Sequence, residues 1–354
     1  TFDDGGFFLL KEAPCSNVQL AWPGFDFVCA GAETLLVGLG ISPDEVLEEE
    51  WTRCYGAVLG VACGGREPLL EALRDYQSRL RRMLPERDEM ILANTWGDRS
   101  KDQKINEDWV KAELDACAHY GVTHLQLDCG WQRARWPEPG TVGPILDRIW
   151  ERDDYWQVHP ERFPNGLGPV IDHARTCGVE LGLWFNPCKK NSHESWRRDA
   201  DVMIDLYHRH GIRTWKIDGT NMPDKASERR LRAMLDAVTD ATDGEAVFNL
   251  DITAGRRYGY FDFVEYGNYF LENRYTDWSN YYPHWTLRNL WMLSAYVPPQ
   301  RLQIEWLNKW RNPSNYDALD PLAPRRVPFD YCFAVTMAAQ PLAWFEASAL
   351  PAEA

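Results

Sequence analysis

The sequence predicts an α/β protein built on a closed (β/α)8 barrel of the TIM type, preceded by the end of a β-sandwich domain. Strand-like runs alternate with amphipathic stretches over about 250 residues from residue 88 onward, which is typical of a parallel sheet. The strand candidates number eight, which favours a closed barrel over an open doubly wound sheet. Polar residues gather at the ends of these runs, as they do at the mouth of a barrel enzyme.

The strands are recognised by short apolar runs bounded by polar or turn residues. The predicted strands are Met90–Asn94, His124–Asp128, Glu180–Phe185, Thr214–Asp218, Ala246–Asp251, Glu265–Glu272, Arg301–Glu305 and Leu342–Glu346. The predicted helices between them are Asp108–Tyr120, Gly168–Cys177, Trp196–Gly211, Ser227–Asp240, His284–Tyr296 and Phe329–Ala338. No Gly-x-Gly-x-x-Gly or P-loop pattern follows any strand, which excludes the commonest nucleotide-binding open sheets.

The first part of the chain has a different pattern. Its short β runs, punctuated by Gly, Pro and Asp, are Phe7–Leu10, Phe25–Ala30, Thr34–Leu39 and Gly56–Val61. We expect residues 1–66 to be the C-terminal part of an N-terminal β-sandwich domain and residues 67–87 to be a linking helix that Pro85 closes. Residues 88–354 are then the barrel.

Composition and charge limit the classes of partner. A formal net charge of −15 makes nucleic acid and anionic membrane surfaces poor partners, and no apolar run is long enough to span a bilayer. A neutral or cationic substrate, such as an oligosaccharide or glycoconjugate, is more compatible with the negative electrostatic potential of this protein. The 17 Trp and 15 Tyr fit sugar stacking, and they fit an aromatic core equally well. A homo-oligomer stays open.

The cysteines and the first residues bear on compartment and completeness. The nine Cys show no Cys-x-x-Cys pair or Cys/His metal spacing, so we expect neither a zinc site nor a disulfide framework. Reduced thiols suit a cytoplasm-like compartment. The chain starts at Thr1 without an initiator Met, so we expect a piece of a longer protein, and the sequence leaves cytoplasmic and secreted locations both open.

Acidic and amide residues stand at the carboxyl ends of the predicted strands, which converge on one mouth in a barrel. They are Asn94 with Trp96, Asp128, Asn186, Lys216 with Asp218, Asp251, Glu272 with Asp277, Glu305 and Glu346. Each of them alone could simply cap the following helix. So many acidic strand ends together favour a catalytic site.

A retaining glycosidase needs two carboxyl groups about 5–5.5 Å apart, one as nucleophile and one as acid/base. Asp218 is the candidate nucleophile. Lys216 and Asp218 alternate along one strand and so point to the same side, where the ammonium would keep the carboxylate ionised. The alternative is a structural salt bridge at the barrel end.

The second carboxyl group is expected in the segment Glu272–Trp278. We favour Asp277 as the acid/base, because Tyr275 and Trp278 would desolvate it, and Glu272 is the alternative. Arg274 would bind the sugar or hold a carboxylate in place. Asp277 could instead merely pair with Arg274.

These residues resemble glycoside hydrolase family 36 of clan D, the α-galactosidase and α-N-acetylgalactosaminidase group. The motifs that carry the resemblance over nearly the whole chain are Asn94-Thr-Trp-Gly, Leu127-Asp-Cys-Gly-Trp131, His159-Pro-Glu-Arg-Phe-Pro-Asn-Gly-Leu167, Gly182-Leu-Trp-Phe-Asn-Pro187, Trp215-Lys-Ile-Asp218 and Arg274-Tyr-Thr-Asp277. They are similar to the family's N-S-W-E, D-D-G-W, K-F-P-N-G-L, G-L-W-F-E-P, K-x-D and R-x-S-D motifs. Because the sequence stops soon after Glu346, we expect it not to include the family's C-terminal β domain.

By position, the resemblance implies a nucleophile and an acid/base, several sugar-binding residues, and no metal or organic cofactor. Asp218 would be the nucleophile and Asp277 the acid/base. The side chains implied in substrate binding are Trp96, Asp128, Cys129, Trp131, Trp184, Lys216, Asp251, Glu272 and Arg274. Of these, Asp128 would bind the O4 and O6 region of a galacto-configured sugar, and Trp184 would line or stack on the ring.

Two departures from the family's motifs concern the sugar. Cys129 stands where D-D-G-W has its second Asp, so part of the usual hydroxyl recognition is missing or re-made. Asp251 stands about where the family's C-S-x-G-G-G-R segment has Cys, near the sugar's 2-position. A carboxylate there could pair with a 2-ammonium group, which predicts an α-galactosaminide as substrate. It could instead bond Arg256, Arg257 or a backbone amide.

Three other functions stay open. A raffinose-synthase-like transglycosylase would use the same residues and differ in acceptor binding. A non-catalytic glycan-binding barrel would not need the pair Asp218 and Asp277. An α-glucosidase of the family 31 type fits the Phe163-Pro-Asn-Gly and Gly182-Leu-Trp-Phe stretches less well.

Overall fold

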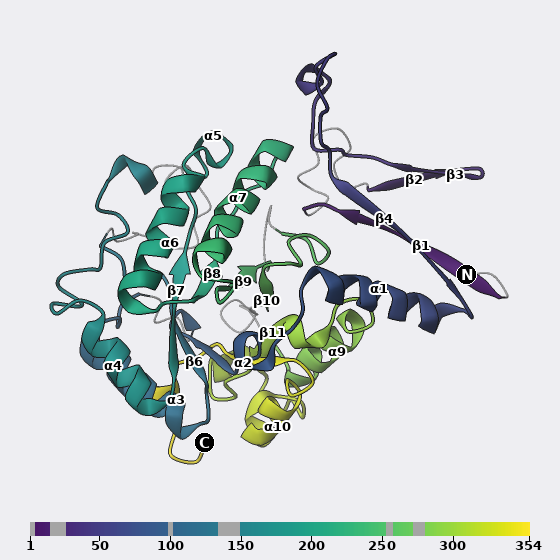
Figure 1. Cartoon of the computed structure of the whole chain (residues 1–354). Coiled ribbons are helices and arrows are strands. Elements are labelled where there is room, and N and C mark those ends of the chain that lie inside the picture. Colours follow the sequence, from purple (N-terminus) through teal and green to yellow (C-terminus); the bar gives the residue numbers. More distant parts are fainter. Residues whose placement is uncertain (1–3, 15–25, 98–101, 134–148, 253–257, 272–279) are drawn as a thin grey trace.

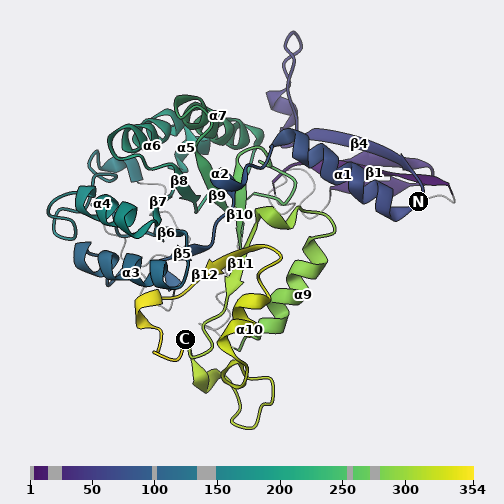
Figure 2. The ribbon, with the colours of Figure 1, turned by 60° about the horizontal axis from the view of Figure 1, so that its bottom comes forward.

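The computed structural model describes residues 4–14, 26–97, 102–133, 149–252, 258–271 and 280–354. Its centre is a closed barrel of parallel strands in the order β10-β11-β12-β5-β6-β7-β8-β9. Figure 2 shows the helices placed around these strands. The predicted (β/α)8 fold class is therefore confirmed.

The barrel strands all coincide with predicted strands and differ from them only at their ends. They are β5 (Leu92–Asn94), β6 (His124–Leu127), β7 (Glu180–Phe185), β8 (Thr214–Ile217), β9 (Val247–Asp251), β10 (Gly267–Leu271), β11 (Leu302–Trp306) and β12 (Gln340–Ala343). The last strand shifts most, because its ladder with β11 runs from Gln340 to Ala343 and not to the predicted Glu346. Glu346 therefore lies in the segment after the strand.

Helices overlap all six predicted stretches, but the last two end before the predicted Tyr296 and Ala338. They are α3 (Glu107–His119), α4 (Gly168–Cys177), α5 (Lys190–His193), α6 (Trp196–His210), α7 (Lys225–Ala241), α9 (Pro283–Leu293) and α10 (Phe329–Ala334). The Asn106 and Asp224 side chains accept from the backbone amides of Trp109 and Ser227 and so cap α3 and α7. Short 3-10 turns add η2 (Pro43–Glu45), η5 (Pro299–Arg301), η6 (Pro313–Asn315), η7 (Pro324–Arg326) and η8 (Ala347–Ala349).

The N-terminal part forms two pairs of antiparallel strands. Strand β1 (Gly5–Glu12) pairs with β4 (Gly56–Cys63), and β2 (Phe27–Ala30) pairs with β3 (Glu33–Leu36). These strands extend away from the barrel, on the side of α7 and α1 (Figure 1). The assignment of residues 1–66 to the end of a β-sandwich domain remains a prediction.

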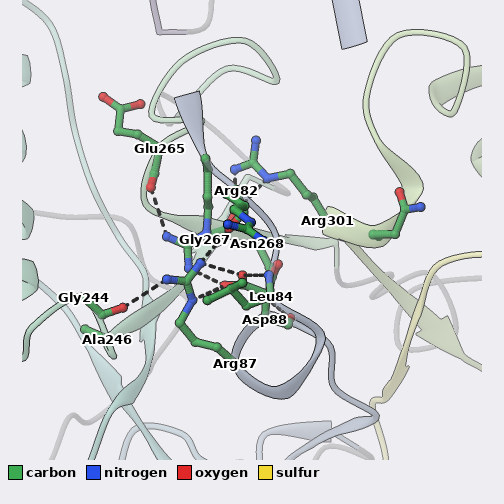
Figure 3. A network of polar contacts seen from close by, with 12 residues as sticks. Arg82, Leu84, Arg87, Asp88, Gly244, Ala246, Glu265, Gly267, Asn268 and Arg301 are labelled. Atoms are coloured by element: carbon green, nitrogen blue, oxygen red, sulfur yellow. Dashed lines mark hydrogen bonds and ion pairs between the residues drawn. The ribbon is translucent and has the colours of Figure 1, made fainter. Parts of the chain in front are cut away.

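The predicted linking helix over 67–87 is two helices, α1 (Arg66–Leu80) and α2 (Pro85–Asp88), joined by an extended turn. Asp88 fixes this turn: its carboxylate accepts from Leu84 N at 2.8 Å and pairs with the guanidinium groups of Arg81 and Arg87. The Asp88 carbonyl accepts from Asn268 Nδ2 at 2.9 Å, next to the start of β10 (Figure 3). This network ties the linker to the N-terminal end of the barrel.

A layer of buried amides fills the barrel above that network. Gln303 Nε2 donates to Asn249 Oδ1 at 2.8 Å, and Gln340 Nε2 donates to Asn268 Oδ1 at 3.2 Å. All four side chains are almost fully buried. Buried amides need partners, and here they supply one another between alternate strands, from β11 to β9 and from β12 to β10.

Of the helices the structure describes, none is long and apolar enough to cross a membrane.

Candidate active site

Lys216 lies at the centre of the barrel mouth. Its Nζ contacts Asp128 Oδ2 at 2.9 Å, Asp218 Oδ2 at 3.6 Å and Asp251 Oδ2 at 3.6 Å. The three carboxylates come from the ends of β6, β8 and β9, so barrel closure brings together residues that lie far apart in the chain. The structure thus places Lys216 and Asp218 on the same side of β8, as their alternation predicts.

The Lys216 ammonium is buried and also faces two aromatic rings. Its Nζ lies 4.5 Å from the centroid of the Phe270 ring and 5.3 Å from that of Trp344. Burial of a charge is costly unless opposite charges compensate it, and here carboxylates and ring faces both do so. Neither aromatic residue was singled out from the sequence, because each reads as an ordinary core residue of an apolar strand.

Asp218 differs from the other two carboxylates in being open to solvent. Its side chain is 16% exposed, whereas those of Asp128 and Asp251 are 3% and 1% exposed. Trp184 Nε1 donates to Asp218 Oδ2 at 3.0 Å and Gly219 N donates to Oδ1 at 2.5 Å. Two N–H donors and an ammonium therefore orient an accessible carboxylate and stabilise its negative charge.

The turn that follows Asp218 requires glycine. Gly219 has a φ of +64°, and a Cβ at this position would lie 2.2 Å from Asn186 Nδ2. Asn186, which directly follows β7 and is predicted to lie at the mouth, thus packs directly against the turn. This packing fixes the Gly219 amide that holds Asp218.

Asp128 is held by the segment that opens the barrel. Asn94 Nδ2 donates to Asp128 Oδ2 at 2.9 Å, and Asp128 N donates to Thr95 Oγ1 at 2.9 Å. Asn94 Oδ1 in turn accepts from the backbone of Trp96, which is 6% exposed. Residues of the Asn94-Thr-Trp-Gly motif therefore hold the Asp128 carboxylate in its position beside Lys216.

Two predicted sugar-binding residues lie behind the mouth. The Cys129 thiol is buried and accepts from Gln132 Nε2 at 3.2 Å, and burial holds the pKa of this thiol well above its usual value. Trp131 is fully buried, and its Nε1 donates to the carbonyl oxygen of Trp184 at 2.9 Å. Both positions therefore contribute to the layer that supports Trp184 and Asp128.

The support behind Trp184 is aromatic, and it was not predicted. Trp156 stacks on Trp131 with ring centroids 5.9 Å apart and on Phe185 with centroids 4.1 Å apart. Trp156 comes from a loop between β6 and β7, where no strand or helix pattern marks it. Its role follows from packing and could not be found by spacing.

The remaining predicted residues divide into two groups. Glu305 and Glu346 are buried near the mouth, and Glu346 pairs with Lys104 Nζ at 2.6 Å. Glu272, Arg274 and Asp277 lie outside the described residues.

Comparisons of the sequence and of the structure with known proteins both find similarity to α-galactosidases. The sequence profile of the Melibiase family matches residues 69–238. The chain is 32% identical over 97 residues to α-galactosidase Mel36A of Lactobacillus acidophilus, which covers 27% of this chain and 12% of that protein. It is 25% identical over 179 residues to the probable α-galactosidase G of Aspergillus terreus, covering 48% of this chain and 23% of that protein.

Crystal structures show the same fold. The GH36 α-galactosidase AgaA of Geobacillus stearothermophilus superimposes with a TM-score of 0.62 at 15% identity, over 84% of this chain and 45% of that one. The α-galactosidase from Lactobacillus brevis gives a TM-score of 0.63 at 13% identity, over 84% of this chain and 43% of that one. The chain therefore spans less than half the length of these related structures. The profile match over residues 69–238, the similar α-galactosidases and the GH36 structures together support membership of the GH36 α-galactosidase family.

Proposed function

We propose that this chain carries the catalytic barrel of a retaining α-glycosidase that hydrolyses terminal α-linked galacto-configured sugars, with Asp218 as nucleophile. The observation that carries the proposal is the solvent exposure and the hydrogen bonding of the Asp218 carboxylate. It is the solvent-accessible member of three carboxylates at the mouth, and N–H donors hold both of its oxygens. The relatives in the family are named α-galactosidases, and variants of AgaA were crystallised with raffinose and with stachyose.

The proposed reaction has two steps. In the first, an Asp218 oxygen attacks the anomeric carbon, the bond to the leaving oxygen breaks, and Asp277 gives that oxygen a proton. In the second, Asp277 takes a proton from water, and the water oxygen displaces Asp218 from the sugar. Glu272 is the alternative acid/base, and no cofactor takes part in either step.

The side chains around Asp218 suit this chemistry. Lys216 partly offsets the charge of the nucleophile without reaching it as closely as it reaches Asp128, at 3.6 Å against 2.9 Å. Trp184 lies beside the carboxylate and can present its ring to the sugar. The developing positive charge of an oxocarbenium-like transition state would meet three carboxylates and one ammonium among the described residues of the mouth.

Replacement of the nucleophile tests the proposal. We expect Asp218→Ala to lose hydrolysis of p-nitrophenyl α-galactoside by at least about 10³-fold. Azide should then restore turnover and yield the glycosyl azide of inverted configuration, because azide enters the space of the missing carboxylate. Asp205→Ala, which removes an exposed helix carboxylate, is the matched control and should stay active. Unchanged hydrolysis by Asp218→Ala would mean that another residue is the nucleophile, and a parent protein that binds the sugar without hydrolysing it would support a glycan-binding barrel.

We further propose that the sugar is an α-galactosaminide with a free 2-ammonium group. The three carboxylates exceed the single ammonium by two negative charges, 3 − 1 = 2, among the described residues of the mouth. Asp251 is the member of this set expected near the sugar's C2. Its position within 3.6 Å of Lys216 also gives it a partner inside the protein, so substrate preference must decide between the two roles.

Comparing three p-nitrophenyl glycosides tests this finer proposal separately from the first. We expect the highest kcat/KM with the α-galactosaminide, and Asp251→Asn should reduce that value more than the value for the α-galactoside. Preference for the α-galactoside or the α-N-acetylgalactosaminide would contradict the galactosaminide proposal and leave Asp218 as nucleophile intact. Product analysis with an added acceptor sugar distinguishes hydrolysis from transfer.

A further inference from the structure

Three metal-binding side chains converge on the outside of the barrel, between α3 and α4. Asp115 lies on α3, and His173 and Cys177 lie one turn apart on α4. His173 Nε2 lies 2.8 Å from Asp115 Oδ1, and Cys177 Sγ lies 3.4 Å from the same oxygen. All three ligand atoms lie within 4.8 Å of one another, and none of the three side chains is fully buried. Sequence spacing across the whole chain did not reveal this group, because its members come from two helices.

The donor set selects one class of ion. Thiolate and imidazole ligands favour zinc and similar transition metals over calcium and magnesium, which take oxygen ligands. From Zn–S bonds of about 2.3 Å and Zn–N and Zn–O bonds of about 2.0–2.2 Å, a tetrahedral ion would hold the ligand atoms about 3.4–3.6 Å apart. The side chains therefore need to move by less than about 1.5 Å to meet one ion. A carboxylate, a thiolate and a neutral imidazole also balance the charge of a divalent cation.

We propose that Asp115, His173 and Cys177 bind a Zn²⁺ ion that fastens α3 to α4, with water as the fourth ligand. Asp115 and Cys177 lie near the C-terminal ends of their helices. Barrel helices run antiparallel to the strands, so these ends lie at the opposite side from the catalytic mouth. The ion is structural in this position, and Figure 1 shows α3 and α4 side by side there.

Binding changes the proton positions in a defined way. In the ion-free chain the Cys177 thiol donates to Asp115 Oδ1 at 3.4 Å. Zn²⁺ displaces one proton from Cys177 into solvent, and His173 carries its proton on Nδ1 while Nε2 binds the ion.

Cobalt and zinc binding by the full chain test the proposal. After treatment with a chelator, Co²⁺ should give the visible absorption of a tetrahedral ion and a near-ultraviolet thiolate-to-cobalt band. Equilibrium dialysis should then show that Cys177→Ser and His173→Gln each bind one Zn²⁺ per chain fewer than the parent. Cys29→Ser and His208→Gln remove an exposed thiol and an exposed imidazole elsewhere and should bind as the parent does.

The melting temperature gives a second readout. Zn²⁺ should raise it in the parent and in the controls and leave it unchanged in the two site variants, because only a folded chain holds the two helices together. Asp115→Asn provides a third site variant if either of the others fails to fold. The absence of the cobalt band in the parent, or an unchanged zinc stoichiometry in folded Cys177→Ser and His173→Gln, would overturn the proposal. The three side chains would then form a hydrogen-bonded contact between helices only.

Discussion

The hydrogen bond from Trp184 to Asp218 gives the sharpest prediction about catalysis. Trp184→Phe keeps an aromatic ring beside the site and removes the indole N–H that lies 3.0 Å from Asp218 Oδ2. A hydrogen bond to a charged group contributes about 1.5–3 kcal/mol. The loss corresponds to about a 10- to 100-fold reduction in kcat/KM if the bond serves the transition state.

Steady-state kinetics with p-nitrophenyl α-galactoside measure this effect, and they should show the loss mainly in kcat. The reason is that a nucleophile held by one N–H donor fewer spends less time in the attacking orientation. Trp310→Phe is the matched control, because it removes an indole N–H that donates to the carboxylate of Glu353 at 2.9 Å in an exposed contact. The control should keep its activity. A loss of less than about threefold in Trp184→Phe, with the parent's melting temperature, would refute the role assigned to this bond.

Three further predictions concern the barrel mouth and its base. Lys216→Met leaves three carboxylates at the mouth without their ammonium, so we expect a loss of about 3–5 kcal/mol of unfolding free energy in urea titrations as well as loss of activity; a variant as stable as the parent would contradict this interpretation. Gly219→Ala meets Asn186 at 2.2 Å in a backbone conformation of φ +64°, so we expect a cost of about 1–3 kcal/mol and a drop in kcat, and unchanged values in both measurements would show that the turn can relax. Burial alone would raise the pKa of Asp88, but hydrogen bonds and charges from Arg87, Arg81 and Leu84 N outweigh burial and hold this pKa below its usual value of 3.8. The ionised Asp88 carboxylate therefore stabilises the folded protein above pH 3.8, and this contribution is lost as pH falls through the lowered pKa. The stability of Asp88→Asn should therefore lie below that of the parent by a nearly constant amount above about pH 5 and approach it as pH falls from about 4 toward 2, and a difference that stays constant down to about pH 2 would contradict the linkage.

The sequence predicted the barrel well because its local signals agree with its topology. Apolar runs of strand length alternate with helical periods, and the two-residue period along Thr214–Asp218 is by itself enough to place Lys216 and Asp218 on one side of the strand. The ends of elements were less predictable, since they depend on partners. Strand β12 ends at Ala343 because its ladder with β11 ends there, and nothing in the local sequence reports that pairing.

The sequence predicted the charged residues of the site but not the aromatic residues that pack around them. Acidic residues after strands are conspicuous, whereas Trp344 and Phe270, whose rings face Lys216, look like any buried aromatic residue. For Trp131 the error is the opposite one, since the sequence assigned it to the sugar site. Its place in a motif implied sugar contact, but its indole N–H donates to the Trp184 carbonyl oxygen. Which aromatic residue faces the ligand depends on packing between loops that are distant in sequence.

The amide layer below the mouth was also missed. A lone Asn249 in the apolar run of β9 has no visible partner in the sequence, and only barrel closure brings Gln303 to 2.8 Å from it. The same reasoning explains why the sequence did not bring together the proposed metal ligands Asp115 and Cys177, which lie on two different helices.

Trapping of the covalent intermediate tests the central claim most directly. In 2-deoxy-2-fluoro-α-galactosyl fluoride, the fluorine at C2 slows both steps, whereas the fluoride at C1 is a good leaving group that lets the first step proceed. The sugar should therefore accumulate as an ester on the nucleophile. Peptide mass spectrometry after acid proteolysis is expected to find one fluorosugar on the peptide that contains Asp218 and none in the Asp218→Ala variant. Labelling of a different carboxylate, such as Glu305 or Asp251, would contradict the assignment of Asp218 as the nucleophile.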